Sequence, residues 1–309
     1  MIAVTGATGF IGRRLVLHLR EAGVPVRALA RDPRRAAPLA AAGAEVTRGD
    51  LADPQALARL LRGARALVHC AGAVRGRTPG EFLAVNRDPV AGLLDAAAQA
   101  GVARVLLLSS LAARHPELSP YAQSKRLGEA AALGHPAGLP LAILRPPAVY
   151  GPGDRELAAL FWWLERGWLW ATGPRQQRLS LLFVDDLVAA IDQWLRTPTP
   201  VTGIFPLADG TPDGYTWPDL AEEARRALGR PIRLHFLPAR LLRSAGRLTA
   251  ALARLTGRPP MLSPGKVREL RHPDWRCDHR AFAAATGWEP RVRFGEGLAR
   301  TLAARREGA

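Results

Sequence analysis

The glycine-rich stretch "VTGATGFIGRR" constrains the fold of this chain more than any other segment. It follows the apolar run 1–5 and opens a helical pattern, and Gly6, Gly9 and Gly12 form a G-x-x-G-x-x-G spacing within it. Thirty glycines in 309 residues produce this spacing by chance in about 0.3 of such chains, so the spacing alone is weak. Between a strand and a helix, however, glycine permits a tight turn and lets the backbone approach a pyrophosphate, which the helix N–H groups then face. The alternative is a purely structural glycine turn.

Short apolar runs alternate with helical patterns throughout the first half of the chain. The apolar runs span 1–5, 24–30, 44–50, 66–72, 102–110 and 141–146, and the helical patterns span 10–22, 54–62, 87–100 and 121–133. Strands that alternate with helices are typical of a parallel sheet with helices on both faces. The sequence therefore predicts an α/β protein with a doubly wound parallel Rossmann sheet and a smaller, mixed C-terminal substrate domain.

The pattern loosens after residue 150, where prolines become frequent. We expect residues 1–150 to form the dinucleotide-binding domain, and residues 151–178 and 204–309 to form the substrate-binding domain. Residues 179–203 contain an apolar run that enters a helical pattern, and we expect this segment to rejoin the first domain.

The composition limits the partners and the compartment. The net charge is +16, yet only two of the 43 basic residues are lysines and the arginines are spread along the chain. No basic–aromatic nucleic-acid module is present, so an arginine-rich surface is favoured over a nucleic-acid partner. The two cysteines, Cys70 and Cys277, indicate neither a disulfide framework nor a metal site. Since we find no signal peptide and no apolar run of about 18 residues, we expect a cytoplasmic protein.

Charged residues after the second and third strands bear on the choice of dinucleotide. Arg31 precedes Asp32, and a guanidinium there pairs with a 2′-phosphate through a forked contact, so NADP is favoured over NAD. The alternative is a solvated Arg31, with Asp32 binding the ribose. Asp50 is either an acceptor for the adenine amino group or a helix cap. Ala71 and Gly72, after the fourth strand, leave room for the cofactor to lie against the backbone.

The spacing from Tyr121 to Lys125 places a phenol and an ammonium on the same face of a helix. With three tyrosines and two lysines in the chain, it arises by chance in about 2% of shuffled sequences. Tyrosine, with a pKa of about 10, is a poor base at neutral pH, and a neighbouring cation lowers that pKa. Ser109 and Ser110 end the preceding strand, where such sheets bind ligands. The stretch predicts a hydride-transfer site; the alternative is an exposed helix start.

Four further polar residues are open to two interpretations. Asn86 anchors either a backbone bend or a proton-relay water. Tyr150 either approaches the substrate or only packs. Asp185 and Asp186, in "FVDDL", are expected to cap a helix rather than to act in catalysis.

The motifs "TGATGFIG", "GDL", "HCAG", "YAQSK", "LRPPAVYGPGD" and "FVDDL" occur in the order typical of the extended short-chain dehydrogenase/reductase family, which this chain resembles to about residue 190. The ending "HRAFAAATGWEPRVRFGEGLARTL" is also similar to that family. The resemblance implies that Tyr121 donates or accepts the proton, that Lys125 holds the nicotinamide ribose and lowers the tyrosine pKa, and that Ser110 bonds the substrate oxygen. The cofactor-binding residues that it implies are Gly6, Thr8, Gly9, Phe10, Ile11, Gly12, Arg31, Asp50, Leu51, Ala71, Gly72, Tyr121, Lys125 and Pro146.

The substrate end is less specific. The apolar residues 111–113 follow Ser110, where nucleotide-sugar dehydratases of the family carry an acid pair, so dehydration is disfavoured. Four tryptophans within 161–170 and the amphipathic stretch 236–262 indicate an apolar pocket or lid. The layout is similar to the branch with 3β-hydroxysteroid dehydrogenases and dihydroflavonol reductases. We expect an NADP-dependent dehydrogenase or reductase acting on a hydroxyl or ketone of a small, apolar molecule.

Other functions remain open at this point. A nucleotide-sugar epimerase needs only reversible hydride transfer and rotation of the substrate. A non-catalytic NADP-binding sensor or assembly subunit is a third reading, against which the intact Ser110, Tyr121 and Lys125 count. The tryptophans are alternatively ordinary core. A homodimer is left open, and contact of the arginine-rich helix with an anionic membrane surface is considered but not favoured.

Overall fold

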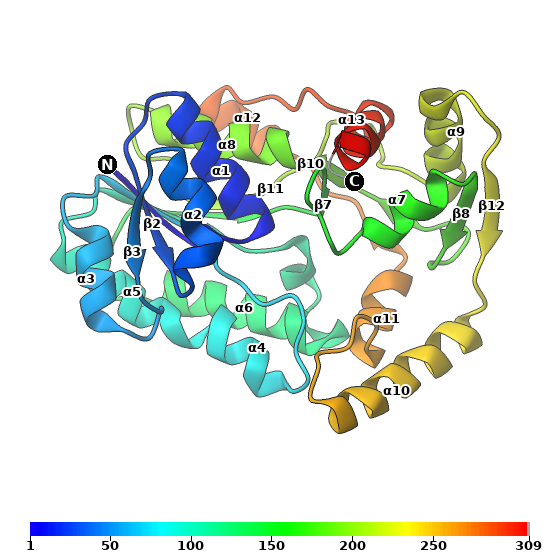
Figure 1. Ribbon diagram of the computed structural model, residues 1–309, viewed down its shortest axis with the longest axis horizontal. Coiled ribbons are helices and arrows are strands. Elements are labelled where there is room, and N and C mark those ends of the chain that lie inside the picture. Colours follow the sequence, from blue (N-terminus) through cyan, green and yellow to red (C-terminus); the bar gives the residue numbers. More distant parts are fainter. Residues whose placement is uncertain (308–309) are drawn as a thin grey trace.

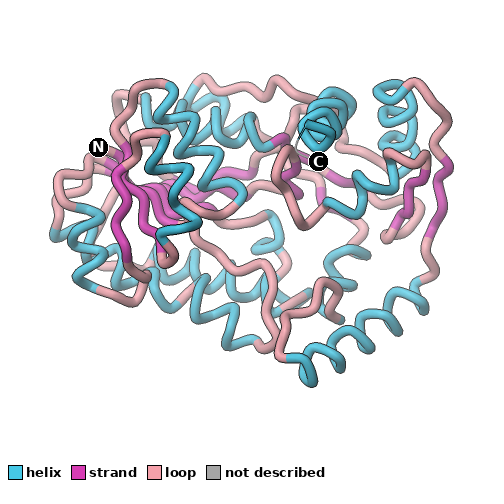
Figure 2. The backbone as a smooth tube through the Cα atoms, viewed as in Figure 1, coloured by secondary structure: helices cyan, strands magenta, loops and turns pink. Residues whose placement is uncertain are grey.

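The computed structural model describes residues 1–307 and contains a seven-stranded parallel sheet between two layers of helices (Figure 2). The order across the sheet is β11-β6-β5-β4-β1-β2-β3. The strands are β1 (Ile2–Thr5), β2 (Val26–Ala30), β3 (Glu45–Arg48), β4 (Ala66–His69), β5 (Arg104–Leu108), β6 (Leu141–Arg145) and β11 (Gly203–Pro206). The predicted α/β class and doubly wound sheet are confirmed.

The order in which the chain adds strands reverses between β1 and β4. From β1 the chain continues to β2 and β3 on one side, then crosses to β4, β5, β6 and β11 on the other. β1 and β4 pair in parallel from Ile2 with Ala66 to Thr5 with His69, so both strands end at one edge of the sheet. Ligands of such sheets bind outside the carboxyl ends of the strands where this reversal occurs. The functional site is therefore expected at this edge.

Helices cover the two faces of the sheet separately (Figure 1). The upper face in that view carries α1 (Phe10–Glu21), α2 (Pro33–Ala41), α8 (Val184–Arg196) and α12 (Arg280–Thr286). The lower face carries α3 (Pro54–Leu61), α4 (Pro79–Asn86), α5 (Asp88–Gln99) and α6 (Pro120–Leu133). The starts of α2, α3 and α6 are fixed by a proline in the first turn and by the capping side chains of Asp32, Asp53 and Ser119.

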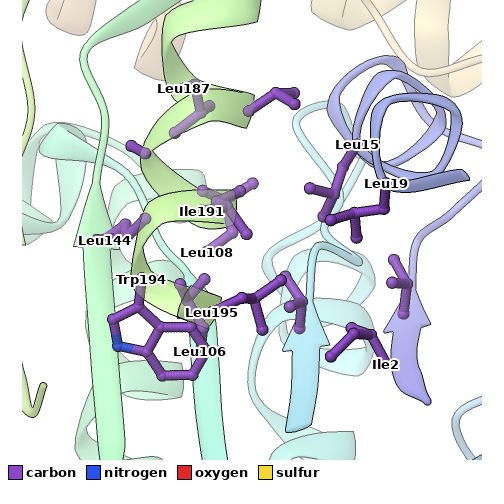
Figure 3. Packing of buried hydrophobic residues seen from close by; sticks show 14 of the residues in the cluster. Ile2, Leu15, Leu19, Leu106, Leu108, Leu144, Leu187, Ile191, Trp194 and Leu195 are labelled. Atoms are coloured by element: carbon purple, nitrogen blue, oxygen red, sulfur yellow. The ribbon is translucent and has the colours of Figure 1, made fainter. Parts of the chain in front are cut away.

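The core of the upper face forms between α8 and the sheet (Figure 3). Ile191 and Trp194 of α8 are fully buried and belong to one cluster with Leu106 and Leu144 of the strands. The Trp194 indole Nε1 donates to the Val201 carbonyl at 2.9 Å, so its polar atom is satisfied inside the core. This helix is thereby packed on the sheet.

Asp185 and Asp186 do not cap α8, which corrects the expectation for them. Asp185 pairs with Arg14 of α1 at 2.6 Å. Asp186 is buried and accepts from the backbone N–H groups of Arg291 and Val292 at 3.1 and 2.8 Å. Both carboxylates are used by neighbouring segments, so they connect α8 to α1 and to the chain before the last helix.

The remaining elements lie beside the carboxyl edge of the sheet, and several of them surround a separate buried cluster that includes Tyr150, Phe161 and Phe294. Tyr150 is only 1% exposed, so it packs in this cluster. The elements are η1 (Leu111–Arg114), η2 (Pro116–Leu118), β7 (Ala148–Tyr150), α7 (Ala158–Leu164), β8 (Trp168–Ala171), β9 (Arg178–Leu179), β10 (Leu181–Phe183), α9 (Trp217–Leu228), β12 (Arg233–Phe236), α10 (Ala239–Thr256), α11 (Pro264–Arg271), β13 (Asp274–Trp275) and α13 (Phe294–Glu307).

β11 belongs to the main sheet, where Gly203–Pro206 pair with β6. α12 packs on it, with the Phe282 and Phe205 rings 5.4 Å apart. The domain boundary expected after residue 203 therefore falls inside β11, because this strand completes the main sheet. Among residues 1–307, no helix combines the length and the apolar character needed to cross a membrane.

Candidate active site

The glycine-rich turn brings the ends of β1 and β4 into contact. Gly6 has a φ of +66°, and a Cβ on it would lie 2.4 Å from the Ala71 nitrogen. A Cβ on Gly12 would lie 2.3 Å from the Gly6 carbonyl oxygen. Both separations are shorter than real Cβ atoms tolerate, so only glycine fits at these two positions. The edge of the sheet therefore presents bare backbone at this point.

The start of α1 is open toward the same edge. Its N-cap is Gly9, which has no side chain to bond the first N–H groups, and its first turn contains no acidic residue. These N–H groups and the helix dipole favour an anion such as the pyrophosphate of a dinucleotide. Phe10 opens the helix, and Ile11 packs against the core. The residues present therefore fit the predicted dinucleotide.

Charged side chains gather beyond the ends of β2 and β3. The Arg31 side chain is 77% exposed, and its Nε lies 3.8 Å from Asp50 Oδ2. Arg35 Nη2 reaches back to the Thr8 carbonyl at 3.5 Å, over the glycine-rich turn. The Asp32 carboxylate is used as the cap of α2. Two guanidinium groups are thus placed near the end of the glycine-rich turn. The Asp32 carboxylate, which could otherwise bind a ribose, is hydrogen-bonded to the backbone of α2.

Asp50 does not cap a helix, so that interpretation is wrong. Its carboxylate accepts from the Ala52 N–H at 3.0 Å, and the following Asp53 caps α3. The adjacent Leu51 is partly buried against the core under α3. The Asp50 side chain remains 52% exposed at the edge of the sheet.

The end of β4 meets α4 and α6 at Gly72. A Cβ on Gly72 would lie 3.0 Å from Lys125 Nζ and 3.3 Å from Asn86 Oδ1. Asn86 is buried; its Oδ1 accepts from the Ala73 N–H at 2.9 Å, and its Nδ2 donates to the Ala73 carbonyl and to Ser124 Oγ. Asn86 therefore anchors a backbone bend, which is one of its two interpretations.

The two serines that follow β5 have different partners. Ser109 is buried, and its Oγ donates to Glu129 Oε1 at 2.5 Å. Glu129 is fully buried and also accepts from Arg145 Nε at 2.8 Å and Nη2 at 2.5 Å. Ser110 Oγ instead accepts from the Ala112 N–H at 3.2 Å, and this serine lies near enough to the Tyr121 phenol to lower its pKa. Ser109 thus belongs to a buried ionic network, while Ser110 faces the phenol.

Tyr121 stands in the first turn of α6, directly after the N-cap Ser119 and Pro120. Its ring lies 6.3 Å from that of Phe82 on α4, centroid to centroid. Burial raises the pKa of Tyr121 to about 12, and Ser110 only partly opposes this rise. The phenol is therefore protonated at neutral pH, which suits a proton donor.

Lys125 is buried one turn further along α6, and its Nζ donates to the Leu108 carbonyl at 2.9 Å. Burial lowers the pKa of Lys125 to about 8, and the charges of Cys70 and Glu129 oppose this shift. Lys125 is not among the groups that shift the pKa of Tyr121, because its ammonium is directed to the end of β5. The expected lowering of the tyrosine pKa is thus not found. The ammonium still lies beside Gly72, where it can donate to a group resting on that loop.

A cavity of about 270 Å³ opens beside Tyr121. Its walls come from the loop before α4, the start of α6, one face of α10, and α11 with the loop before it. Apolar atoms of Val74, Phe82, Ala250 and Ala253 line it together with polar groups. The amphipathic stretch 236–262 therefore does contribute to a pocket wall.

The tryptophans of 161–170 do not line this cavity, which corrects the expectation for them. Trp168 and Trp170 lie on β8, where their rings stack within 5° of parallel and both contact the His235 ring of β12. Trp162 and Trp163 are partly exposed on α7. β8 pairs with β12 in a two-stranded sheet at the end of the molecule away from the main sheet (Figure 1), and the two indoles of β8 stack on each other there.

Glu269 of α11 is a buried residue of the cavity that the sequence did not indicate. Its carboxylate accepts from Ser119 Oγ, and its Oε2 lies 3.2 Å from Lys266 Nζ. The two largest influences on the pKa of Tyr121 are burial, which raises it, and Ser110, which lowers it. The charge of Glu269 comes next and raises this pKa. No motif could reveal this contact, because it joins residues 150 positions apart.

The structure brings the predicted residues to one edge of the sheet in two groups. Around the start of α1 lie the glycine-rich turn, Arg31 and Asp50. At the ends of β4 and β5 lie Gly72, Ser110 and the pair on α6. Pro146 adjoins this second group, where its carbonyl accepts from the Leu111 N–H at 2.8 Å. The apolar residues 111–113 are buried in η1 and supply no ionisable group.

Comparison with known proteins places these features in a family. Residues 2–205 match the family described as "NAD dependent epimerase/dehydratase family". A Caulobacter vibrioides protein named "Ceramide reductase" is 41% identical over 276 residues, which cover 89% of this chain and 85% of that protein. A Stenotrophomonas maltophilia protein named "2-alkyl-3-oxoalkanoate reductase" is 27% identical and covers 98% of both chains.

The fold is also shared with solved structures. The structure titled "MoeE5 in complex with UDP-glucuronic acid and NAD" superposes with a TM-score of 0.75. It is 24% identical in sequence, and the match covers 100% of this chain and 99% of that one. At this identity the likeness concerns the fold, a parallel sheet followed by a C-terminal domain.

We expect Glu129→Gln to lower the free energy of unfolding by about 3–5 kcal/mol, because it leaves the Arg145 guanidinium buried without its carboxylate. Ser109→Ala removes one hydrogen bond of the same network and is expected to cost about 1–2 kcal/mol. Chemical denaturation measures both losses. Glu296, exposed and paired with Arg300 on α13, supplies the control, and Glu296→Gln should leave stability unchanged. Equal effects of Glu129→Gln and Glu296→Gln would contradict the buried network.

Proposed function

Because the chain belongs to the NAD dependent epimerase/dehydratase family, as an extended short-chain dehydrogenase/reductase, we propose that it reduces a ketone on a long-chain lipid to the alcohol. The substrate class that we propose is the oxo form of a ceramide, and the proposed reductant is NADPH. The proposed catalytic residues are Ser110, Tyr121 and Lys125.

The position of Tyr121 is the observation that carries this proposal. Its side chain lies next to Ser110 and at the same time lines the cavity beside α10. A carbonyl oxygen placed between the two hydroxyl groups would have a donor on each side. With a pKa of about 12 the Tyr121 phenol carries its proton at neutral pH, as the proton donor of a reduction must.

The reaction adds a hydride to the carbonyl carbon and a proton to its oxygen. A dihydronicotinamide cofactor, when bound, would supply the hydride. Tyr121 donates its phenolic proton to the oxygen as the carbon–oxygen double bond becomes single, and the phenolate then recovers a proton from water. Ser110 donates to the same oxygen and holds it in place. Lys125, beside Gly72, is proposed to hold the ribose of the cofactor.

The substrate class is supported by the relatives and by the cavity. The names "Ceramide reductase" and "2-alkyl-3-oxoalkanoate reductase" both describe reductases of molecules with long or alkyl chains. In this chain, Val74 and Phe82 form an apolar wall close to Tyr121, and Ala250 and Ala253 of α10 face them. Such a wall suits hydrocarbon next to the reacting carbonyl.

A nucleotide-sugar epimerase is the second candidate, because four cations also border the cavity: Arg77, Arg254, Lys266 and Arg268. Three of these have partners in the chain. Arg77 pairs with Glu81, Lys266 pairs with Glu269, and Arg268 donates to a backbone carbonyl of η2. Cations already engaged in this way are less suited to a diphosphate than a converging, unpaired set. The lipid reductase is therefore favoured.

NADP is the proposed cofactor form, with NAD as the alternative. The Arg31 guanidinium is exposed beyond β2, and Arg35 extends over the glycine-rich turn. A 2′-phosphate on the adenosine ribose would meet these two cations. The carboxylate of Asp32 is occupied by the cap of α2, which disfavours its use on a free ribose hydroxyl.

Tyr121→Phe tests the catalytic proposal, because it keeps the ring and removes the proton. Turnover of the oxo form of a ceramide in detergent micelles should fall about 10²–10⁴-fold, with little change in cofactor affinity. Steady-state kinetics and cofactor titration measure the two effects. Tyr150→Phe is the matched control, since that hydroxyl is buried without a hydrogen-bond partner among the described residues and lies outside the cavity. Wild-type turnover in Tyr121→Phe, or conversion of UDP-sugars in place of the lipid, refutes the proposal.

Arg31→Ala tests the cofactor proposal. Loss of a charge-assisted contact to the 2′-phosphate should weaken NADPH binding about tenfold or more and leave NADH binding unchanged. Calorimetric titration of both cofactors gives the two affinities. Arg59→Ala, which removes an exposed guanidinium on α3, serves as the control for charge alone. A wild-type protein that binds both cofactors equally would contradict the assignment.

A further inference from the structure

We propose that α10 and the loop after it dock this protein on an anionic lipid bilayer, with the cavity beside Tyr121 opening toward the lipid. The proposal deepens the proposed reduction of a lipid ketone and rests on it for its purpose. Its physical basis is a docking face, defined as Leu241, Leu248, Leu252, Leu255 and Met261 with the neighbouring arginines Arg240, Arg243 and Arg247.

The apolar part of the docking face is a single stripe. Leu241, Leu248, Leu252 and Leu255 follow one another at spacings of seven, four and three residues, which keep them on one side of the helix. They are between 49% and 84% exposed. Of the nine large hydrophobic side chains exposed in the described part of the chain, these four and Met261 make up five. An apolar stripe of this kind needs a covering surface.

The cationic part runs beside it on the same helix. Arg240, Arg243 and Arg247 are exposed and are spaced by three and four residues, and Arg254 continues the row. The buried side of the helix, with Leu242, lies between the two rows and faces α11. A helix with apolar and arginine rows on its outer surface is typical of segments that lie in a membrane interface.

The charge around α10 indicates which kind of partner covers the docking face. Residues 227–265 contain seven arginines and no carboxylate. A second copy of the chain, packed face to face through α10, would bring these cations together. Anionic headgroups neutralise them instead, while the leucines enter the acyl boundary. The chemistry of the face therefore fits an anionic bilayer better than a homodimer.

The position of α10 connects the docking face to the cavity. The helix lies at the outer margin of the molecule, with α11 as its main neighbour (Figure 1). Ala250 and Ala253 line the cavity together with Arg254 of the arginine row, while the leucine stripe lies on the other side of the same helix. Val74, on the facing wall of the cavity, is itself 50% exposed.

The cavity is too small to enclose a whole two-chain lipid. A volume of about 270 Å³ is below the range of about 300–1,000 Å³ that holds drug-sized ligands, and a two-chain lipid is larger than these. Part of its hydrocarbon must therefore remain outside while the carbonyl reaches Tyr121. A protein docked through α10 would let those chains stay in the bilayer.

Co-sedimentation of the full chain with lipid vesicles tests the proposal without substrate or cofactor. We expect binding to vesicles of phosphatidylcholine mixed with phosphatidylglycerol, and much weaker binding to phosphatidylcholine alone. Leu248→Gln with Leu252→Gln should weaken binding about tenfold or more by removing apolar burial, and Arg243→Gln with Arg247→Gln should do so by removing charge. The controls are Leu133→Gln, at an exposed leucine of α6, and Arg225→Gln with Arg226→Gln on α9.

The outcomes separate docking from catalysis. Failure to bind anionic vesicles, or binding that the α10 variants weaken no more than the controls, overturns the docking proposal. The docking proposal is also overturned if the chain does not bind vesicles and instead forms a homodimer that Leu248→Gln with Leu252→Gln dissociates. The α10 variants should keep wild-type turnover of substrate in detergent micelles and lose it on substrate embedded in vesicles. Vesicle binding by a chain that reduces no lipid ketone overturns the proposed function and leaves docking in place.

Discussion

Gly6, at the end of β1, comes so close to Ala71, at the end of β4, that a Cβ there would lie 2.4 Å from the Ala71 nitrogen. This approach is set by the parallel pairing of β1 and β4, from which the chain continues to strands on opposite sides of the sheet. It leaves bare backbone and an uncapped helix start at one edge of the sheet. Everything assigned to the cofactor depends on that edge, because a side chain at Gly6 would separate the two strands.

A second constraint positions the chemistry over that edge. Glu129 and Lys125 are buried charges on α6, held by Arg145 and Ser109 on one side and by the Leu108 carbonyl on the other. Buried charges of this kind stay only where their partners are fixed, so α6 cannot slide along the sheet. Tyr121, at the start of the same helix, is thereby set against Ser110. Burial in the same packing raises the pKa of Tyr121 to about 12, so the phenol keeps its proton at neutral pH.

The sequence predicted those parts of the structure that depend on local patterns. The glycine spacing, the alternation of strands and helices, and the spacing from Tyr121 to Lys125 all depend on residues close together in the chain. α2 and α4 were missed, because α2 contains Pro38 and α4 has little contrast between its faces. The tryptophans were misplaced because a cluster of large side chains does not reveal which strand they will pair with. Glu269 could not be found, since its contact with Ser119 exists only once α11 folds onto α6.

The central claim is that a hydride passes to a carbonyl carbon next to Tyr121. The most direct measurement uses NADPH that carries deuterium at the transferable position of its ring, with the oxo form of a ceramide as substrate and mass spectrometry of the product. The account predicts one deuterium on the new carbinol carbon of each product molecule, with equal consumption of cofactor. Product without deuterium, or no product while the cofactor binds normally, would contradict it.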